Sequence, residues 1–436
     1  MCGHFVIENP KRRPAAAEGR NGWYPYYAGF SSAFARRLIQ STGLRPESTI
    51  LDPWNGSGTS TVVAVESGYR AMGFDLNPVM AIVAKARLLP NIDAPSVAPL
   101  LSEITKKSAR QRIPTEEDPL LTWFAPSAAA EIRSIERVIY ILLVRADQTS
   151  NPVDAVSGMS SIASFFYLAL FRTVRSLLGR FRTSNPTWVI RPDTLKSRIR
   201  PSAAEISRIF QQQASIMSAD IAAEPRQSHL ANIECTVGVS SSENLPVRAD
   251  SVDLVLSSPP YCTRIDYGVA TSPELAVLGL RMDTQLRELR GKLIGTPTIH
   301  ASPQLPNSTW GPACNAFLQR VAQHPSKAAK SYYYKTYVQY FAGITRSLSE
   351  IARCVKPKGN CIIVIQDSYF KGIRADLATM FTEIASVKKL LLSRRVDFPL
   401  SRTFAYINTR SRSYRSSATS VESVLCYTKV DEDRHD

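Results

Sequence analysis

The chain has 436 residues, of which 44% are hydrophobic, 9% aromatic and 21% charged. This composition excludes a disordered chain, and the length fits one large domain with insertions or two to three smaller domains. Lysine and arginine number 53 against 37 aspartates and glutamates, which gives a formal net charge of +16. Such an excess favours a polyanionic partner, with nucleic acid first and an anionic membrane second.

We expect neither a secretory signal nor a membrane span. The start of the sequence lacks a charged segment followed by a long apolar run. The uncharged, largely apolar stretch 155–171 contains four serines and predicts a buried helix. The seven cysteines include no CxxC pair and the five histidines are scattered, which fits reduced thiols and no metal site. These features predict a cytoplasmic protein without a metal.

The first elements along the chain predict a βαβ unit preceded by an arm. Residues 1–22 are polar and basic, which predicts a mobile arm, either a plain tail or one that touches nucleic acid. A helix is expected at Ser32–Gln40. Two short apolar runs, Ser48–Asp52 and Arg70–Asp75, each end in an acid and flank a helix-like stretch at Ser60–Glu66.

Residues 96–230 predict a helical and strongly basic insertion. Helices are expected at Ala128–Arg145 and Ser161–Arg182. Between positions 172 and 208 stand nine lysines and arginines against two acids. Because the excess is of one sign, it favours a phosphate-contacting surface, a possible DNA-recognition region; the alternative is a solvated helix face.

Strand patterns return after the insertion. Residues 271–330 have weak periodicity and predict a loop-rich insertion. The catalytic domain is therefore expected to be discontinuous, over 23–95 and 231–436, with a mainly parallel α/β sheet. The predicted elements of its second part are strands at Thr236–Val239, Val252–Leu256, Asn360–Ile365 and Glu422–Tyr427, and an amphipathic helix at Val338–Val355.

The loop after the first strand is the first candidate site. It reads Asp52-Pro-Trp54-Asn-Gly56-Ser-Gly58-Thr59, and glycines between a strand and a helix let the backbone approach a ligand closely. Asp52 at the strand end favours a cationic group such as an amino-acid ammonium. Asp75 follows 23 residues later, where folds of this type place a carboxylate on ribose hydroxyls. Both acids fit a positively charged nucleoside, and S-adenosylmethionine is such a ligand.

The second candidate site is Ser258-Pro259-Pro260-Tyr261, directly after a buried strand. Two prolines fix φ and supply carbonyls without competing N–H donors. They can aim a carbonyl and the Ser258 hydroxyl at an exocyclic amine. Tyr261 can then stack on a planar base extruded from its helix.

These motifs resemble those of the DNA amino-methyltransferases, which methylate N4 of cytosine or N6 of adenine. Asp52–Thr59 resembles their cofactor loop, in which Phe usually stands in place of Trp54. Gly73–Pro78 resembles their ribose-acid motif, and Ser258–Tyr261 their catalytic tetrapeptide. The resemblance covers residues 20–90 and 235–430 and implies the Rossmann-like fold of class I methyltransferases.

The resemblance also implies roles for individual residues. Ser258, Pro259, Pro260 and Tyr261 are the expected catalytic residues. A position before Leu245, usually an acid, contacts the adenine amine in the family, and here either Ser241 or Glu243 takes that role. The residues expected to bind S-adenosylmethionine are Tyr27, Phe30, Asp52, Trp54, Gly56, Gly58, Thr59, Asp75, Leu76 and Ser241.

The activity implied is direct methyl transfer to a flipped base of double-stranded DNA. The Ser form of the tetrapeptide is commoner in cytosine-N4 enzymes, so cytosine N4 is favoured over adenine N6, in a restriction-modification or defence context with possible cognate proteins. The alternative enzyme is an RNA base amino-methyltransferase. From another class, the alternative is a nucleic-acid-binding module that kept the fold and lost activity.

Three further stretches remain open between binding and structural roles. Arg264, Asp266 and Tyr267 either line the base pocket or form a local ion pair. Residues 332–337, rich in tyrosine, either stack on bases or pack on the core. A second basic stretch with interleaved tyrosines serves either phosphate contact or solubility, and its arginines are Arg394, Arg395, Arg402, Arg410, Arg412 and Arg415.

Overall fold

The computed structural model describes most of the chain. The described residues are 5–11, 19–25, 29–109, 117–144, 152–181, 189–224, 233–262, 265–299, 305–400 and 420–431. The strands are β1 (Thr49–Asp52), β2 (Arg70–Asp75), β3 (Cys235–Val239), β4 (Val252–Ser257), β5 (Val355–Gln366), β6 (Ser368–Phe370), β7 (Ile373–Ala375), β8 (Leu390–Leu400) and β9 (Ser420–Lys429).

The described part of the chain contains one seven-stranded sheet with the order β3-β2-β1-β4-β5-β9-β8. Strands β1 to β5 run parallel, and β9 lies antiparallel between β5 and β8. The chain thus starts in the middle of the sheet and reverses direction beside β1, where β4 joins it. Ligands of open parallel sheets bind at such a switch point, beyond the carboxyl ends of the strands.

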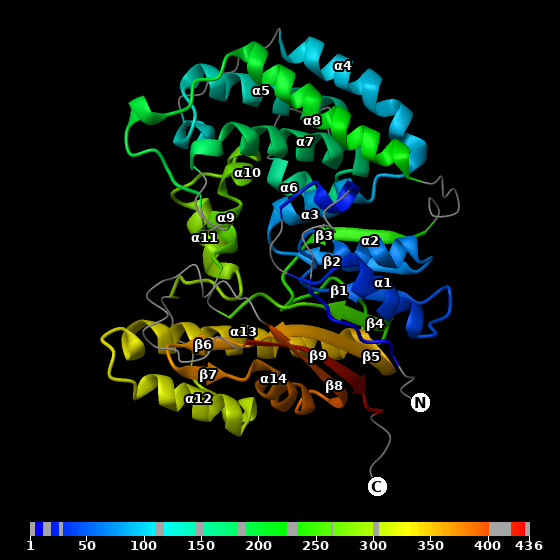
Figure 1. The fold of residues 1–436 in the computed structure, drawn as a ribbon, viewed down its shortest axis with the longest axis vertical. Helices are drawn as coiled ribbons and strands as arrows, with labels where there is room; N and C mark the ends of the chain where they lie inside the picture. Colours follow the sequence, from blue (N-terminus) through cyan, green and yellow to red (C-terminus); the bar gives the residue numbers. More distant parts are fainter. Residues whose placement is uncertain are drawn as a thin grey trace.

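The helices cover both faces of the sheet and one end of it (Figure 1). The principal ones are α1 (Ser32–Ser41), α2 (Thr59–Glu66), α3 (Pro78–Arg87), α4 (Val97–Ser108), α5 (Pro126–Leu143), α7 (Ser161–Leu177), α8 (Ala203–Ala223), α9 (Tyr267–Ala270), α10 (Ser272–Val277), α11 (Gln285–Lys292), α12 (Pro312–Ala322), α13 (Tyr334–Cys354) and α14 (Leu377–Ser386). No helix in the described ranges is long and apolar enough to span a membrane.

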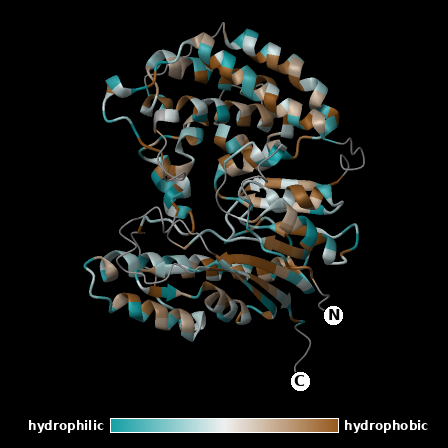
Figure 2. Ribbon diagram, in the orientation of Figure 1, coloured by the Kyte–Doolittle hydropathy of each residue, from teal (hydrophilic) through white to brown (hydrophobic). Residues whose placement is uncertain are grey.

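Successive residues of the central strands supply two different cores. In β5, Ile362 and Val364 pack with α1 and α2, whereas Cys361, Ile363 and Ile365 pack with α13 and α14. Both sets are apolar because side chains of a strand alternate between the two faces and this strand is covered on both. Figure 2 shows the resulting concentration of hydrophobic residues along the strands. The expected Rossmann-like sheet is confirmed.

The helical segment expected at 96–230 forms a bundle of α4, α5, α7 and α8 beside α3. Its core is continuous with the catalytic part, because residues of α3, α7 and α10 belong to one buried cluster. The expected buried helix within 155–171 is α7, in which Phe165 and Leu168 are fully buried. The bundle therefore packs as an integral part of the fold.

Two expectations about irregular segments need correction. In residues 1–22, Phe5 belongs to the core of α1 and α2, and Arg20 donates to the carbonyl of Arg87 at 2.9 Å. The prediction of a mobile arm was wrong for residues 5–11 and 19–22, because local charge does not reveal distant acceptors; residues 12–18 lie outside the described residues.

The segment 271–330 was predicted to be a loop-rich insertion. The structure has three helices there, α10, α11 and α12, which are too short to give a clear helical periodicity in the sequence.

The glycine that starts α2 keeps α2 and α3 close. Gly58 has φ +80°, and a Cβ there would lie 2.6 Å from the Cβ of Ala84 in α3. Gly68, after α2, has a similar φ of +87°, but a Cβ there meets nothing within 4 Å. The two positions share the backbone requirement for glycine and differ in the steric one.

We predict that Gly58→Ala lowers the free energy of unfolding by about 2–4 kcal/mol, from the positive φ and the overpacking together. Gly68→Ala serves as the matched control and should lose only about 1–2 kcal/mol, from the positive φ alone. Urea unfolding of both variants measures the difference. Equal losses would show that the contact with Ala84 has no energetic weight.

Candidate active site

A cavity lies at the carboxyl ends of β1, β2 and β4. Its volume is about 1220 Å³, open solvent at its mouth included. Gly56, Gly58 and Tyr261 are not among the described residues that line it, and Tyr27 lies outside the described residues. The sequence-predicted residues that do line it are Phe30, Asp52, Trp54, Thr59, Asp75, Leu76, Ser241, Ser258, Pro259 and Pro260.

Asp52 ends β1 and is 4% exposed. Its carboxylate accepts hydrogen bonds from the hydroxyls of Ser60 and Ser257 and from the backbone N–H of Trp54, the last at 3.1 Å. Burial raises the pKa of Asp52 to about 6, although these donors act in the opposite direction. Ser257 immediately precedes the tetrapeptide, so Asp52 links the two sequence motifs.

Asp75 ends β2 and is held by backbone donors. Its two oxygens accept from the N–H groups of Gly56, at 2.9 Å, and Asn77, at 2.8 Å. Burial raises the pKa of Asp75 to about 6, and the nearby Asp52 carboxylate adds to the rise. The backbone N–H of Gly56 thus positions the Asp75 carboxylate. Gly58 instead allows α2 and α3 to pack closely.

Two tyrosine hydroxyls hold the backbone of the tetrapeptide. Tyr267 accepts a hydrogen bond from the N–H of Tyr261 at 3.2 Å. Tyr340 of α13 donates its hydroxyl to the carbonyl of Pro260, also at 3.2 Å. Within the described residues, no donor reaches the carbonyl of Pro259, which lines the cavity. The loop therefore offers Ser258 and the Pro259 carbonyl to a ligand.

The two candidates for the contact before Leu245 are separated by the structure. Ser241 lines the cavity, as does Ser242. Glu243 instead forms an ion pair with Arg346 at 2.8 Å and does not line the cavity. Of the two alternatives, the geometry favours Ser241.

The helical bundle contributes a side chain to the cavity that the sequence did not reveal. Arg175 of α7 lines the cavity and forms an ion pair with Glu274 of α10, which is fully buried. The guanidinium also donates to the hydroxyl of Tyr24 at 2.9 Å and to the carbonyl of Ala270 at 2.7 Å. Arg175 is separated from these partners by 95 to 151 residues of sequence, so no local pattern could identify them.

A chain of hydrogen bonds connects β2 to the catalytic loop through Asn77 and Thr271, which the sequence did not single out, and through Tyr267, which it did. Asn77 caps α3 and donates its side-chain amide to the hydroxyl of Thr271 at 2.8 Å. Thr271 donates in turn to the carbonyl of Tyr267 at 2.9 Å, and Tyr267 holds Tyr261. Asn77, Thr271 and Tyr267 all line the cavity. The sequence signal that could have identified Asn77 as a site residue is the polar–apolar alternation of Asp75-Leu76-Asn77.

The stretches left open by the sequence take mostly structural roles where they are described. Asp266 pairs with Arg290 at 2.6 Å, whereas Tyr267 lines the cavity and Arg264 lies outside the described residues. Cys262 is buried in the core.

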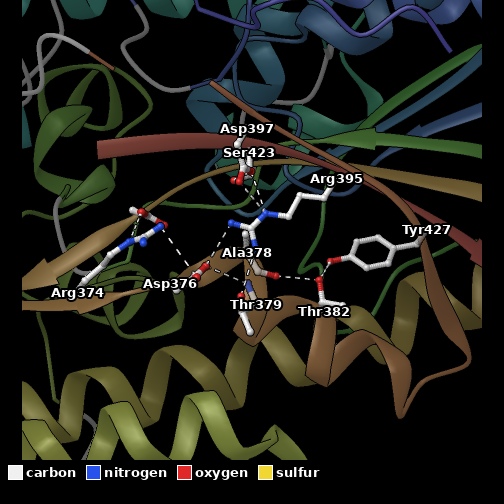
Figure 3. A network of polar contacts seen from close by, with 10 residues as sticks. Arg374, Asp376, Ala378, Thr379, Thr382, Arg395, Asp397, Ser423 and Tyr427 are labelled. Carbon is white, nitrogen blue, oxygen red and sulfur yellow. Dashed lines mark hydrogen bonds and ion pairs between the residues drawn. The ribbon is translucent and has the colours of Figure 1, made fainter. Parts of the chain in front are cut away.

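The two described arginines of the second basic stretch each have a partner within the protein. Figure 3 shows Arg395 directed at Asp397, beside Arg374 and Asp376. Arg394 donates to the carbonyl of Phe5 at 2.9 Å. These two arginines are engaged within the protein. The other four lie outside the described residues.

Comparison with known proteins finds relatives of one kind. The chain is 26% identical to type II methyltransferase M.BsoBI of Geobacillus stearothermophilus over 62% of its length, and the match spans about half (54%) of that relative. It is 20% identical to type II methyltransferase M.MvaI of Kocuria varians over 83% of its length and 80% of the relative. A third match, to type II methyltransferase M.SmaI of Serratia marcescens, reaches 41% identity over 68 residues, 15% of this chain and 23% of that one.

No protein-family model matches the chain. Among solved structures, a geranyl diphosphate methyltransferase in complex with its substrate and sinefungin covers 92% of this chain and 78% of its own, with 9% identity. Its TM-score of 0.34 is too low to inform the fold or the ligand.

The sheet order, with the antiparallel β9 between β5 and β8 and with acids at the ends of β1 and β2, is that of the Rossmann-like class I methyltransferase fold. By sequence, the chain is a relative of the type II methyltransferases. The resemblance drawn from the motifs is thereby confirmed at the level of the family.

We predict that Arg175→Met destabilises the protein by about 3–5 kcal/mol, because it leaves the charge of Glu274 buried without its partner. The double variant Arg175→Met, Glu274→Gln should recover a large part of this loss, since it removes the unpaired charge. Guanidinium unfolding of the two single variants and the double variant gives the coupling energy. Additive losses would mean that the ion pair does not join α7 to the site.

Proposed function

We propose that this protein is a DNA methyltransferase that transfers a methyl group from S-adenosylmethionine to the exocyclic amine of a flipped base, cytosine N4 ahead of adenine N6. One observation carries the proposal: a single cavity combines the carboxylates of Asp52 and Asp75 with Ser258, Pro259 and Pro260. A restriction-modification or defence setting is part of the proposal, and the similarity to type II methyltransferases supports it.

The lining of the cavity fits the cofactor. S-adenosylmethionine supplies an electrophilic methyl group on a sulfonium, next to a zwitterionic amino-acid tail and a nucleoside. Asp75 offers a carboxylate for ribose hydroxyls, and Asp52 one for a cationic group. Trp54 and Asn55 line the same cavity, and the indole N–H of Trp54 and the side-chain NH2 of Asn55 are buried without a hydrogen-bond partner among the described residues.

The catalytic loop fits an amine. The hydroxyl of Ser258 and the carbonyl of Pro259 accept the two N–H hydrogens, which turns the nitrogen lone pair toward the methyl carbon. Because Tyr340 already occupies the Pro260 carbonyl, Pro259 is the acceptor of the pair. The new N–C bond forms as the C–S bond breaks, and the surplus amine proton leaves to water. No covalent bond to the protein is needed, so positioning supplies the rate enhancement.

DNA is favoured over the RNA alternative by the relatives, which are type II enzymes and so DNA methyltransferases as a class. The choice of cytosine N4 rests on Ser258. A hydroxyl occupies the tetrapeptide position that carries Asp or Asn more often in adenine-N6 enzymes, as the motif resemblance implies.

The first experiment is a methylation assay with labelled S-adenosylmethionine and, separately, unmethylated genomic DNA and total RNA. We expect N4-methylcytosine in the DNA digest, identified by mass spectrometry. N6-methyladenine would keep the class and change the base. Label confined to RNA would replace the proposal by its alternative, and a protein that binds no S-adenosylmethionine in calorimetry would be a binding module.

We predict that S-adenosylmethionine binds more weakly as pH falls through 6, because Asp52 and Asp75, with pKa values of about 6, must be ionised to bind it. Affinity should be level above pH 7 and fall by up to about tenfold per pH unit for each group below pH 5.5. Titration calorimetry from pH 5 to 8 measures this. The ligand-free protein should behave oppositely. Both pKa values are raised above those of the unfolded chain, so its stability declines as pH rises from about 4 to 6.

We predict that Tyr261→Ala lowers the rate of methyl transfer about a hundredfold, because the flipped base loses its stacking partner. The affinity for S-adenosylmethionine should stay within about twofold, since Tyr261 does not line the cavity. Tyr261→Phe keeps the ring and is the matched control, with nearly full activity. Undiminished transfer by the alanine variant would remove the role proposed for Tyr261.

A further inference from the structure

The turn between α12 and α13 carries a cluster of unpaired positive charges. Between Glu288 and Glu350 the sequence contains no aspartate and no glutamate. Lys327, Lys330 and Lys335 are exposed in this stretch, and no ion pair to them occurs within the described residues. By contrast, the basic residues nearest to the cavity in this stretch are paired, Lys292 with Glu288 and Arg290 with Asp266.

The local structure makes these charges unfavourable without a partner. Residues 329–333 form a π-helical turn that runs into α13, and no acid stands in the first turn of α13. Lys330 and Lys335 therefore lie near the positive end of the dipole of a 21-residue helix. A helix start usually carries acids, so an all-basic one points to an external anion. Tyr333, 37% exposed, stands between the two lysines.

The same segment is attached to the catalytic loop by two routes. Tyr340 of α13, seven residues beyond Tyr333, donates to the carbonyl of Pro260. Tyr332 donates to the carbonyl of Pro297 at 2.9 Å, and Pro297 belongs to the irregular segment 293–299. This segment lies against the catalytic loop, since a Cβ on Gly295 would be 2.6 Å from the carbonyl oxygen of Tyr261.

We propose that Lys327, Lys330, Tyr333 and Lys335, termed the α13 patch, bind the phosphate backbone of the target DNA duplex beside the cavity. This inference rests on the proposed function and adds the surface that docks the duplex. A basic patch with an interleaved aromatic suits a phosphate backbone, since lysine pairs with phosphate as a point charge and tyrosine packs on sugar or base. The helical bundle offers a competing basic surface at Lys196, Arg198 and Arg200, where the exposed acids Asp193 and Glu205 lie nearby in sequence.

The test is the salt dependence of DNA binding by Lys327→Gln, Lys330→Gln, Lys335→Gln, measured by fluorescence anisotropy with a labelled duplex. If each lysine neutralises one phosphate, the slope of log affinity against log salt becomes shallower by about 2.7. At 0.15 M salt the affinity should then fall about a hundredfold. The affinity for S-adenosylmethionine should stay within about twofold.

The matched control removes the same three charges elsewhere, as Lys106→Gln, Lys107→Gln, Lys388→Gln. Lys106 and Lys107 lie on α4, on the far side of the helical bundle from the sheet (Figure 1). This control should change the slope by less than one unit. Equal behaviour of the two triple variants would overturn the α13 patch, and loss of binding on substitution of Lys196, Arg198 and Arg200 would then assign docking to the bundle.

Failure of the proposed function has a different signature. A wild-type protein that neither binds nor methylates duplex DNA refutes the proposed function and the patch together. A wild-type protein that methylates DNA while the patch variant binds it normally refutes the patch alone. Methylation of RNA only, with RNA binding lost in the patch variant, would reassign the patch to RNA and overturn its assignment to a DNA duplex.

Discussion

The buried carboxylate of Asp52 joins the two halves of the site. It accepts hydrogen bonds from Ser60, at the start of α2, and from Ser257, the last residue of β4. The cofactor loop and the catalytic loop follow neighbouring parallel strands. Donors at the start of both loops bind to this one carboxylate. Because a buried charge is costly unless its hydrogen bonds are satisfied, the three donors around Asp52 are needed wherever it is ionised. In the proposed function, the methyl donor and the accepting amine would be held in a fixed relation by this carboxylate.

The elements and motifs near the strand ends could be predicted because they are local in sequence. The strand Arg70–Asp75 has the predicted bounds, since an apolar run bounded by a turn and an acid is a complete local signal. The acids at the ends of β1 and β2 follow from the same patterns. Two adjacent serines show the limit of this reasoning, because they look alike in sequence. Ser257 is fully buried and donates a hydrogen bond to Asp52, whereas Ser258 lines the cavity.

What the sequence could not predict depends on contacts between distant segments. Arg175 looked like one more charge of a basic stretch, but Glu274 and Tyr24 turn it into a buried part of the cavity wall. Arg395 was likewise counted with the exposed cations and is engaged by Asp397. A count of charges therefore cannot locate a nucleic-acid surface. Burial and pairing separate the arginines that stabilise the fold from the lysines that remain free to meet a partner.

The rigidity of the catalytic loop explains why the approach of the base must be organised from outside it. Tyr267 and Tyr340 occupy the N–H of Tyr261 and the carbonyl of Pro260, and the prolines fix their own φ angles. A loop so constrained is preorganised for one amine position and cannot follow a misplaced base, so the duplex has to be brought into register. Helix α13 links the two, with Tyr340 on the loop and with Lys335 and Tyr333 of the α13 patch five and seven residues earlier in the chain. One rigid helix can thus set the position of the phosphate backbone relative to the atoms that react.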